Sequence, residues 1–237
     1  MLRVMGLAML PVAGNFAGAL IAEVSPGSDR WRNRALHAAV GVVFAVVAVE
    51  IMPEALRALE GWKIAVAFLA GGLLYLAVKS ITERRSDGAE QSRMWLIYIA
   101  VATDLFGDGL LIGAGTSVAA SLGLVLALGQ VLADVPEGAA SSLTFKANGI
   151  RRRNRLLLSA SFAIPALVAA ALSYATLRDQ SDGAQLAALV ATAGLFSVAV
   201  FEDMITESHD AAEDTRASTV ALLAGFALFV TVSTGLD

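Results

Sequence analysis

The sequence has 237 residues, of which 57% are hydrophobic and only 16% charged, and its mean hydropathy is +0.70. A soluble domain needs more polar residues to cover its surface, so this composition indicates that the chain lies in a lipid bilayer. The absence of cysteine excludes disulfides and thiolate metal ligands. The net charge of −4, without a large basic face, gives no support for nucleic-acid binding.

Eight apolar runs are long enough to cross a bilayer, because a helix needs about 20 apolar residues to span about 30 Å of hydrocarbon. Short charged or Gly-, Pro- and Asp-containing segments separate them, and little sequence remains for a soluble domain. We therefore expect an all-α membrane protein in which residues 1–237 form a single transmembrane domain. The predicted spans are 4–21, 36–52, 62–78, 95–118, 122–145, 156–177, 185–201 and 220–232.

Positive charge is distributed unequally between the two sets of alternating loops. Of the 17 Lys and Arg residues, only Arg3, Arg57, Lys63 and Arg178 fall on the side that carries the two termini. The positive-inside rule places the side rich in Lys and Arg in the cytoplasm. We therefore expect both termini to be extracytoplasmic, which fits an even number of spans.

The ends of the second and seventh spans resemble each other. Residues 48–55 read AVEIMPEA and residues 200–207 read VFEDMITE, with the acids offset by one position. The two spans run in opposite directions, as an inverted repeat of helices 1–3 and 6–8 around helices 4–5 requires. An acidic end after an apolar run is also common by chance, so the sequence leaves both readings open.

Acidic residues inside predicted spans are the most informative feature of the sequence. Asp104 and Asp108 lie in the fourth span, and Asp134 and Glu137 lie in the fifth. An aspartate at the middle of a membrane helix costs about 2.5 to 3.5 kcal/mol, so four such acids need a partner. Protons or a divalent metal ion would supply one, and a hydrogen-bonded cluster of protonated carboxyls is the structural alternative.

The spacing of these acids predicts that they meet. Asp104 and Asp108 are four residues apart, and Gln130, Asp134 and Glu137 also share one helix face. The loop between the two spans is short, so the helices should be adjacent and antiparallel. At about 1.5 Å per residue, both sets of oxygens lie near the middle of the bilayer. The sequence therefore predicts a carboxylate site between helices 4 and 5.

Two segments that hold these acids read TDLFGDGL, residues 103–110, and ADVPEG, residues 133–138. The first resembles the helix-4 signature His-Asn-x-x-Asp-Gly, and the second resembles the helix-5 signature His-Glu-x-Pro-His/Glu-Gly, of the Zrt-/Irt-like (ZIP) metal transporters. The chain therefore resembles a divergent, bacterial-type member of that family. The acidic segments that end helices 2 and 7 also look like family motifs, so the resemblance covers nearly the whole chain. It implies an eight-helix transporter in the bacterial inner (cell) membrane that carries a divalent metal towards the cytoplasm, and it suggests a homodimer.

The resemblance also implies which residues bind the metal. By position Asp108, Asp134 and Glu137 would be ligands, and Asp104 stands where the family usually has histidine. Leu105 replaces the usual asparagine, and another ligand is absent at Ala133. The resulting all-oxygen site should shift preference from zinc towards manganese, iron(II), magnesium or calcium, and the transported ion is expected to belong to the zinc, manganese, iron or cadmium class. The expected metal set is Asp104, Asp108, Asp134, Glu137, Gln130, Glu202, Asp203 and Glu50, the last three as relay acids or as solvated helix ends.

The only two histidines offer a further, weaker site. His37 begins the second span, whereas His209 follows the seventh beside Asp210, Glu213 and Asp214. This group would form a cytoplasmic cation exit site, or it would simply be a hydrated acidic loop.

We expect no enzymatic activity and no cofactor other than the metal carried as substrate. A membrane-embedded hydrolase would need a nucleophile or histidine base near the acids, and none is placed there. The competing readings are a carrier of protons or monovalent cations, and a ZIP-shaped metal sensor that no longer transports.

Overall fold

The computed structural model describes residues 1–24, 28–84, 91–213 and 215–235, and this part of the chain is almost entirely helical. Its elements are α1 (Leu2–Val24), α2 (Asp29–Ala45), η1 (Val46–Ile51), α3 (Met52–Ala58), α4 (Gly61–Arg84), α5 (Gln91–Val118), α6 (Ala120–Ala147), α7 (Arg152–Ser161), α8 (Ala163–Leu177), α9 (Asp182–Ala199), η2 (Val200–Ile205), α10 (Thr206–Ala211) and α11 (Arg216–Thr234).

Eight helices among the described residues are long and apolar enough to cross a membrane, which confirms the predicted number and the all-α class. They are Leu2–Val24, Asp29–Ala58, Gly61–Ile81, Tyr98–Val118, Ala120–Ala147, Arg152–Leu177, Asp182–Ile205 and Arg216–Thr234. Most extend past the predicted spans, because polar residues continue a helix beyond its apolar run. The second span is the longest, at 30 residues, since α2, η1 and α3 form one continuous rod.

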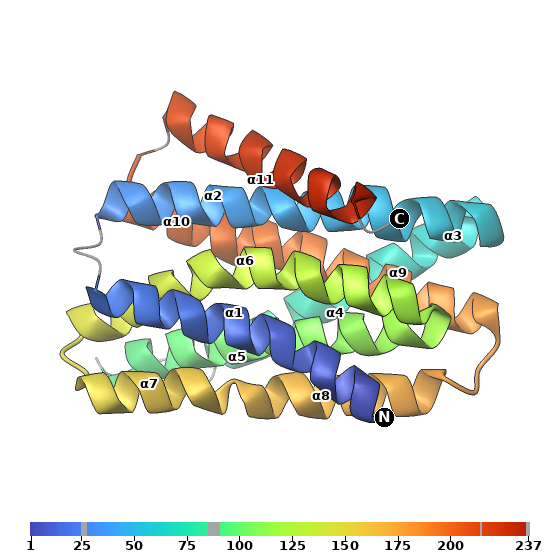
Figure 1. The fold of residues 1–237 in the computed structure, drawn as a ribbon, viewed down its shortest axis with the longest axis horizontal. Helices are drawn as coiled ribbons and strands as arrows, with labels where there is room; N and C mark the ends of the chain where they lie inside the picture. The colour runs from blue at the N-terminus through green and yellow to red at the C-terminus, as the bar shows by residue number, and fades with distance from the viewer. Residues whose placement is uncertain (25–27, 85–90, 214, 236–237) are drawn as a thin grey trace.

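Successive membrane-spanning helices run in opposite directions, so both termini lie at the same end of the bundle (Figure 1). We call this the termini end. At the opposite end α1, α4, α6 and α10 finish, and α2, α5, α7 and α11 begin. We call it the arginine-rich end, because it carries Arg30, Arg32, Arg34 and the cluster at 151–155.

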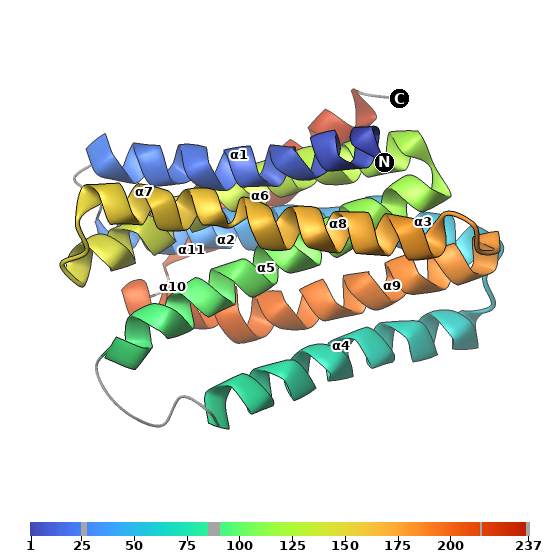
Figure 2. The ribbon, with the colours of Figure 1, turned by 90° about the horizontal axis from the view of Figure 1, so that it is seen from below.

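Four helix pairs make the most extensive contacts, and they fall into two matching sets. α1 packs on α6 as α5 packs on α8, and α2 packs on α11 as α4 packs on α9. α11 and α4 both lie at the periphery of the molecule, α11 along the upper edge in Figure 1 and α4 along the lower edge in Figure 2. Exchanging α1 with α8, the α2 rod with the α9 rod, α4 with α11, and α5 with α6 reproduces the same contacts. This is the pairing that the predicted inverted repeat requires.

Glycines at corresponding positions bring the flanking pairs into backbone contact. A Cβ on Gly41 would lie 2.0 Å from the carbonyl oxygen of Leu222, and one on Gly194 would lie 2.0 Å from that of Phe68. On the partner helices, a Cβ on Gly225 would lie 2.0 Å from the carbonyl oxygen of Ala38, and one on Gly71 would lie 1.7 Å from that of Ala191. No other residue fits these positions without moving the neighbouring helix.

The two rods also share an irregularity. Each changes from α-helix to π-helix for six residues, in η1 and in η2. These are the segments whose sequences resemble each other, and they carry Glu50, Glu202 and Asp203. A π-helical turn inserts a residue, loosens the backbone hydrogen bonds and is frequent at functional sites.

Candidate cation site

The predicted juxtaposition of helices 4 and 5 is present as the contact between α5 and α6. Asp104 and Asp108 project from α5 towards Asp134 on α6, and one carboxylate oxygen from each lies within 4.8 Å of the others. Glu137 is not one of these three, but its carboxyl contacts that of Asp104 and interacts electrostatically with that of Asp134. The four acids therefore come together as the sequence predicts.

Most of these oxygens are buried and lack a donor. Asp108 is 0% exposed and Asp134 is 1% exposed. Both carboxylate oxygens of Asp134, Oδ2 of Asp108 and Oε2 of Glu137 have no hydrogen-bond partner in the part of the chain that the structure describes. Native proteins seldom leave buried polar atoms unsatisfied, so these oxygens are available for a ligand.

Gln130 lies on α6 one turn before Asp134, on the side of the cluster that faces the termini end. Its side-chain amide donates a hydrogen bond to Oδ1 of Asp108, and its own carbonyl oxygen, Oε1, has no partner among the described residues. The amide thereby fixes the Asp108 carboxylate and adds one further oxygen to the cluster. Its place beside the acids agrees with the prediction from the helix face.

Access to the cluster differs between its two ends. Asp104, one turn nearer the arginine-rich end than Asp108, is the only partly exposed member. On the other side, one turn of α6 beyond Gln130, Leu126 is fully buried and its side chain lies against Gly115 of α5. This apolar layer lies between the two helices on the side of the termini end.

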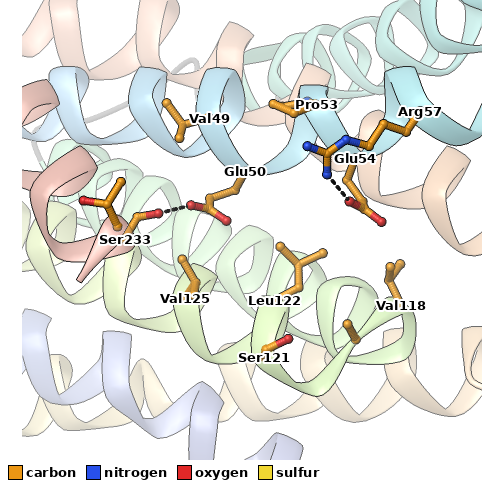
Figure 3. Close-up of a pocket in the computed structure, with 12 residues that line it drawn as sticks. Val49, Glu50, Pro53, Glu54, Arg57, Val118, Ser121, Leu122, Val125 and Ser233 are labelled. Carbon is orange, nitrogen blue, oxygen red and sulfur yellow. Dashed lines mark hydrogen bonds and ion pairs between the residues drawn. The ribbon is translucent and has the colours of Figure 1, made fainter. Parts of the chain in front are cut away.

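Beyond this apolar layer, a pocket of about 430 Å³ opens at the termini end. Glu50 of η1 points into it and accepts a hydrogen bond from Ser233 of α11 (Figure 3). Glu54 lies on the same wall and pairs with Arg57 at 3.5 Å. Glu50 is therefore not part of the central cluster. It lies in η1, and the rod continues for eight residues beyond it, to Ala58, rather than ending there as the sequence predicted.

Glu202 and Asp203 occupy the corresponding turn of the other rod, nearer the arginine-rich end. Both pair with Lys79 of α4 at 3.0 Å, and Asp203 also accepts a hydrogen bond from Tyr75. Asp203 interacts electrostatically with Asp104. These two acids thus lie beside the cluster without joining it.

The two histidines come together although they are 172 positions apart in the sequence. Their rings meet edge to face with centroids 6.5 Å apart, and Nδ1 of His37 lies 2.8 Å from the carbonyl oxygen of Asn33. The side chain of Asp210, and Asp214 altogether, lie outside the described residues. The predicted exit site around His209 therefore stays a prediction.

One buried polar residue near the cluster escaped sequence analysis. Asn15 of α1 is 0% exposed, and both its amide nitrogen and its amide oxygen lack a partner among the described residues. Its backbone lies against Gly138, next to Glu137. A single amide in an otherwise apolar helix was the available signal, since such a residue is costly within a bilayer.

The donor atoms of the cluster are of the kind that hard cations prefer. They are carboxylate and amide oxygens, without sulfur or imidazole, and they converge from two helices at the centre of the bundle. Comparison with protein-family models and with curated proteins gives no match for this chain.

Proposed function

We propose that this protein moves a divalent metal cation across a membrane, and that the carboxylate cluster between α5 and α6 is the site through which the ion passes. The single observation that carries the proposal is the convergence of Asp104, Asp108 and Asp134 within 4.8 Å, largely buried in a membrane-spanning bundle. Oxygen-rich sites of this kind bind divalent cations.

The charge balance of the cluster supports the same reading. Asp104, Asp108, Asp134 and Glu137 make no ion pair with any Lys or Arg of the described residues. Four neighbouring carboxylates inside a bilayer cannot all stay ionised without positive charge. A divalent cation would supply that charge while it is bound, and protons would replace it after release.

The ligand set supports a hard ion. Manganese, iron(II), magnesium and calcium prefer carboxylate and amide oxygens, whereas zinc and cadmium are bound more readily where nitrogen or sulfur is present. The resemblance of residues 103–110 and 133–138 to ZIP signatures supports a divergent member of that family. On this proposal the arginine-rich end faces the cytoplasm of the bacterial inner membrane, and the ion moves towards it.

The experiment is uptake into liposomes that contain the purified protein. Mn²⁺, Fe²⁺, Zn²⁺, Cd²⁺, Mg²⁺ and Ca²⁺ are compared for wild type and for the Asp108→Ala, Glu137→Ala double variant. We expect saturable flux of the harder ions in wild type and its loss in the double variant. The matched control is Asp179→Ala, because this acid is exposed in a loop at the termini end.

Each contrary outcome would replace the proposal with a defined alternative. Flux that is unaffected by the double substitution would show that the cluster is not the pathway. A pH-driven flux that persists after removal of divalent metals would indicate a carrier of protons or monovalent cations. Metal binding without flux of any ion would indicate a sensor.

A further inference from the structure

A resident positive charge lies next to the candidate cation site. Nζ of Lys79 is 3.0 Å from Oε2 of Glu202, 3.0 Å from Oδ1 of Asp203 and 3.2 Å from the backbone carbonyl oxygen of Glu202. Three oxygens therefore surround one ammonium group. This carbonyl belongs to the π-helical segment η2, a kind of turn that is frequent at functional sites.

The inverted repeat provides an internal comparison. Lys79 lies eight residues beyond Gly71 on α4, and Ser233 lies eight residues beyond Gly225 on α11. In the same way, Asp203 and Glu50 each lie nine residues beyond the glycine of their rod, Gly194 or Gly41. Lys79 paired with Asp203 therefore corresponds to Ser233 hydrogen-bonded to Glu50.

The two halves thus differ in charge at a matching position. At the termini end the π-segment acid is held by a neutral hydroxyl and points into an open pocket. Towards the arginine-rich end, two acids are held by an ammonium group. Tyr75 reinforces this difference, because its hydroxyl binds Asp203 where the corresponding residue of α11, Phe229, has none.

Lys79 is linked to the central cluster through Asp203. Asp203 pairs with Lys79 and interacts electrostatically with Asp104, which is the partly exposed member of the cluster. On the proposed function, a cation that leaves the cluster past Asp104 comes under the influence of Asp203 and, beside it, Glu202. Without Lys79 these two carboxylates and the Glu202 carbonyl would form a second oxygen site for a divalent ion.

We infer that Lys79 is a built-in competitor for the transported cation, which keeps the Glu202–Asp203 pair from trapping the ion. This inference rests on the proposed function and adds a residue that controls release. A tethered ammonium acts at a high effective concentration, so it can displace a weakly held ion without being supplied from solution. The ammonium group of Lys79 and the cation take turns at the carboxylates of Glu202 and Asp203, and no covalent bond forms or breaks.

The test counts the cations that the purified protein binds. Mn²⁺ binding is measured by equilibrium dialysis for wild type, Lys79→Met, Lys79→Arg and the triple variant Lys79→Met, Glu202→Gln, Asp203→Asn. We expect about one Mn²⁺ per chain for wild type, about two for Lys79→Met, and about one again for the arginine and triple variants. Lys63→Met is the matched control, since Lys63 pairs with Glu60 at the termini end.

Transport measured in liposomes provides the second readout. Lys79→Met should lower the maximal flux of Mn²⁺, because release becomes slow, whereas Lys79→Arg should retain it. If wild type binds one ion and Lys79→Met also binds only one with unchanged flux, the inference is wrong and the proposed function stands. If wild type binds no divalent ion, the proposed function itself fails.

Discussion

Replacement of Asp134 by leucine should stabilise the metal-free protein and abolish its response to metal. Both oxygens of Asp134 are buried without a donor among the described residues. An aspartate at mid-bilayer costs about 2.5 to 3.5 kcal/mol, and a leucine there is favourable by about 0.3 to 0.6 kcal/mol. The substitution should therefore raise the free energy of unfolding of the metal-free protein by about 3 kcal/mol. For a chain of this length that corresponds to roughly 6 to 12 °C in melting temperature.

Metal should remove most of the difference in stability between wild type and the Asp134→Leu variant. An ion at a hundred times its dissociation constant stabilises the folded state by about 2.7 kcal/mol, so wild type should gain most of the difference. The variant should gain nothing. Thermal unfolding in detergent, followed by intrinsic fluorescence with and without Mn²⁺ or Ca²⁺, measures both effects.

A second polar-to-apolar substitution serves as the control. Thr192→Val removes a hydroxyl that is already bonded to the carbonyl oxygen of Ala188 at 2.9 Å, so its melting temperature should change little with or without metal. A metal-free Asp134→Leu protein that melts below wild type would refute the reasoning, because it would mean that the carboxyl is satisfied in the folded state. An Asp134→Leu variant that metal still stabilises would also refute the reasoning.

Two further predictions concern packing and ion pairing. Gly71→Ala places a Cβ 1.7 Å from the carbonyl oxygen of Ala191, so α4 must move away from α9. The free energy of unfolding should fall by about 1 to 3 kcal/mol. Gly6→Ala, whose Cβ would have nothing within 4 Å, should be neutral or slightly stabilising in the same thermal assay. Arg155→Gln removes the bidentate partner of the buried Glu23 carboxylate and leaves it with Arg152 at 3.6 Å, so it should cost about 3 kcal/mol. Arg178→Gln breaks an exposed pair and should cost at most about 1 kcal/mol, and equal losses for the two arginine variants would contradict this difference.

Much of the fold could be predicted because the bilayer imposes strict rules. Apolar length determines the eight spans, and the cost of intramembrane charge indicated that Asp104, Asp108, Asp134 and Glu137 must face one another. A short loop between 118 and 120 made α5 and α6 neighbours. These predictions depend on local spacing, which the sequence displays directly.

What could not be predicted depends on contacts between distant segments. In the sequence, Lys79 is only one of several basic residues near the end of a span. The packing of α4 on α9 brings it to Glu202 and Asp203, more than 120 positions away. The π-helical turns of η1 and η2 were also not predicted. Asn15 was missed because the burial of both its amide atoms depends on how α1 packs against α6.

The glycines described above divide the bundle into parts that can and cannot slide. Where Gly41, Gly71, Gly194 and Gly225 bring backbone against backbone, no side chain separates the helices, so α2 with α11 and α4 with α9 must move as rigid bodies. Where the flanking pairs meet α5 and α6, two glycines face aromatic rings instead: Gly129 faces Phe229 and Gly107 faces Phe196. A ring can rotate while the contact is kept. If the protein transports a cation as proposed, we expect the shear surface to lie along these ring contacts, with each flanking pair displaced as a unit past α5 and α6.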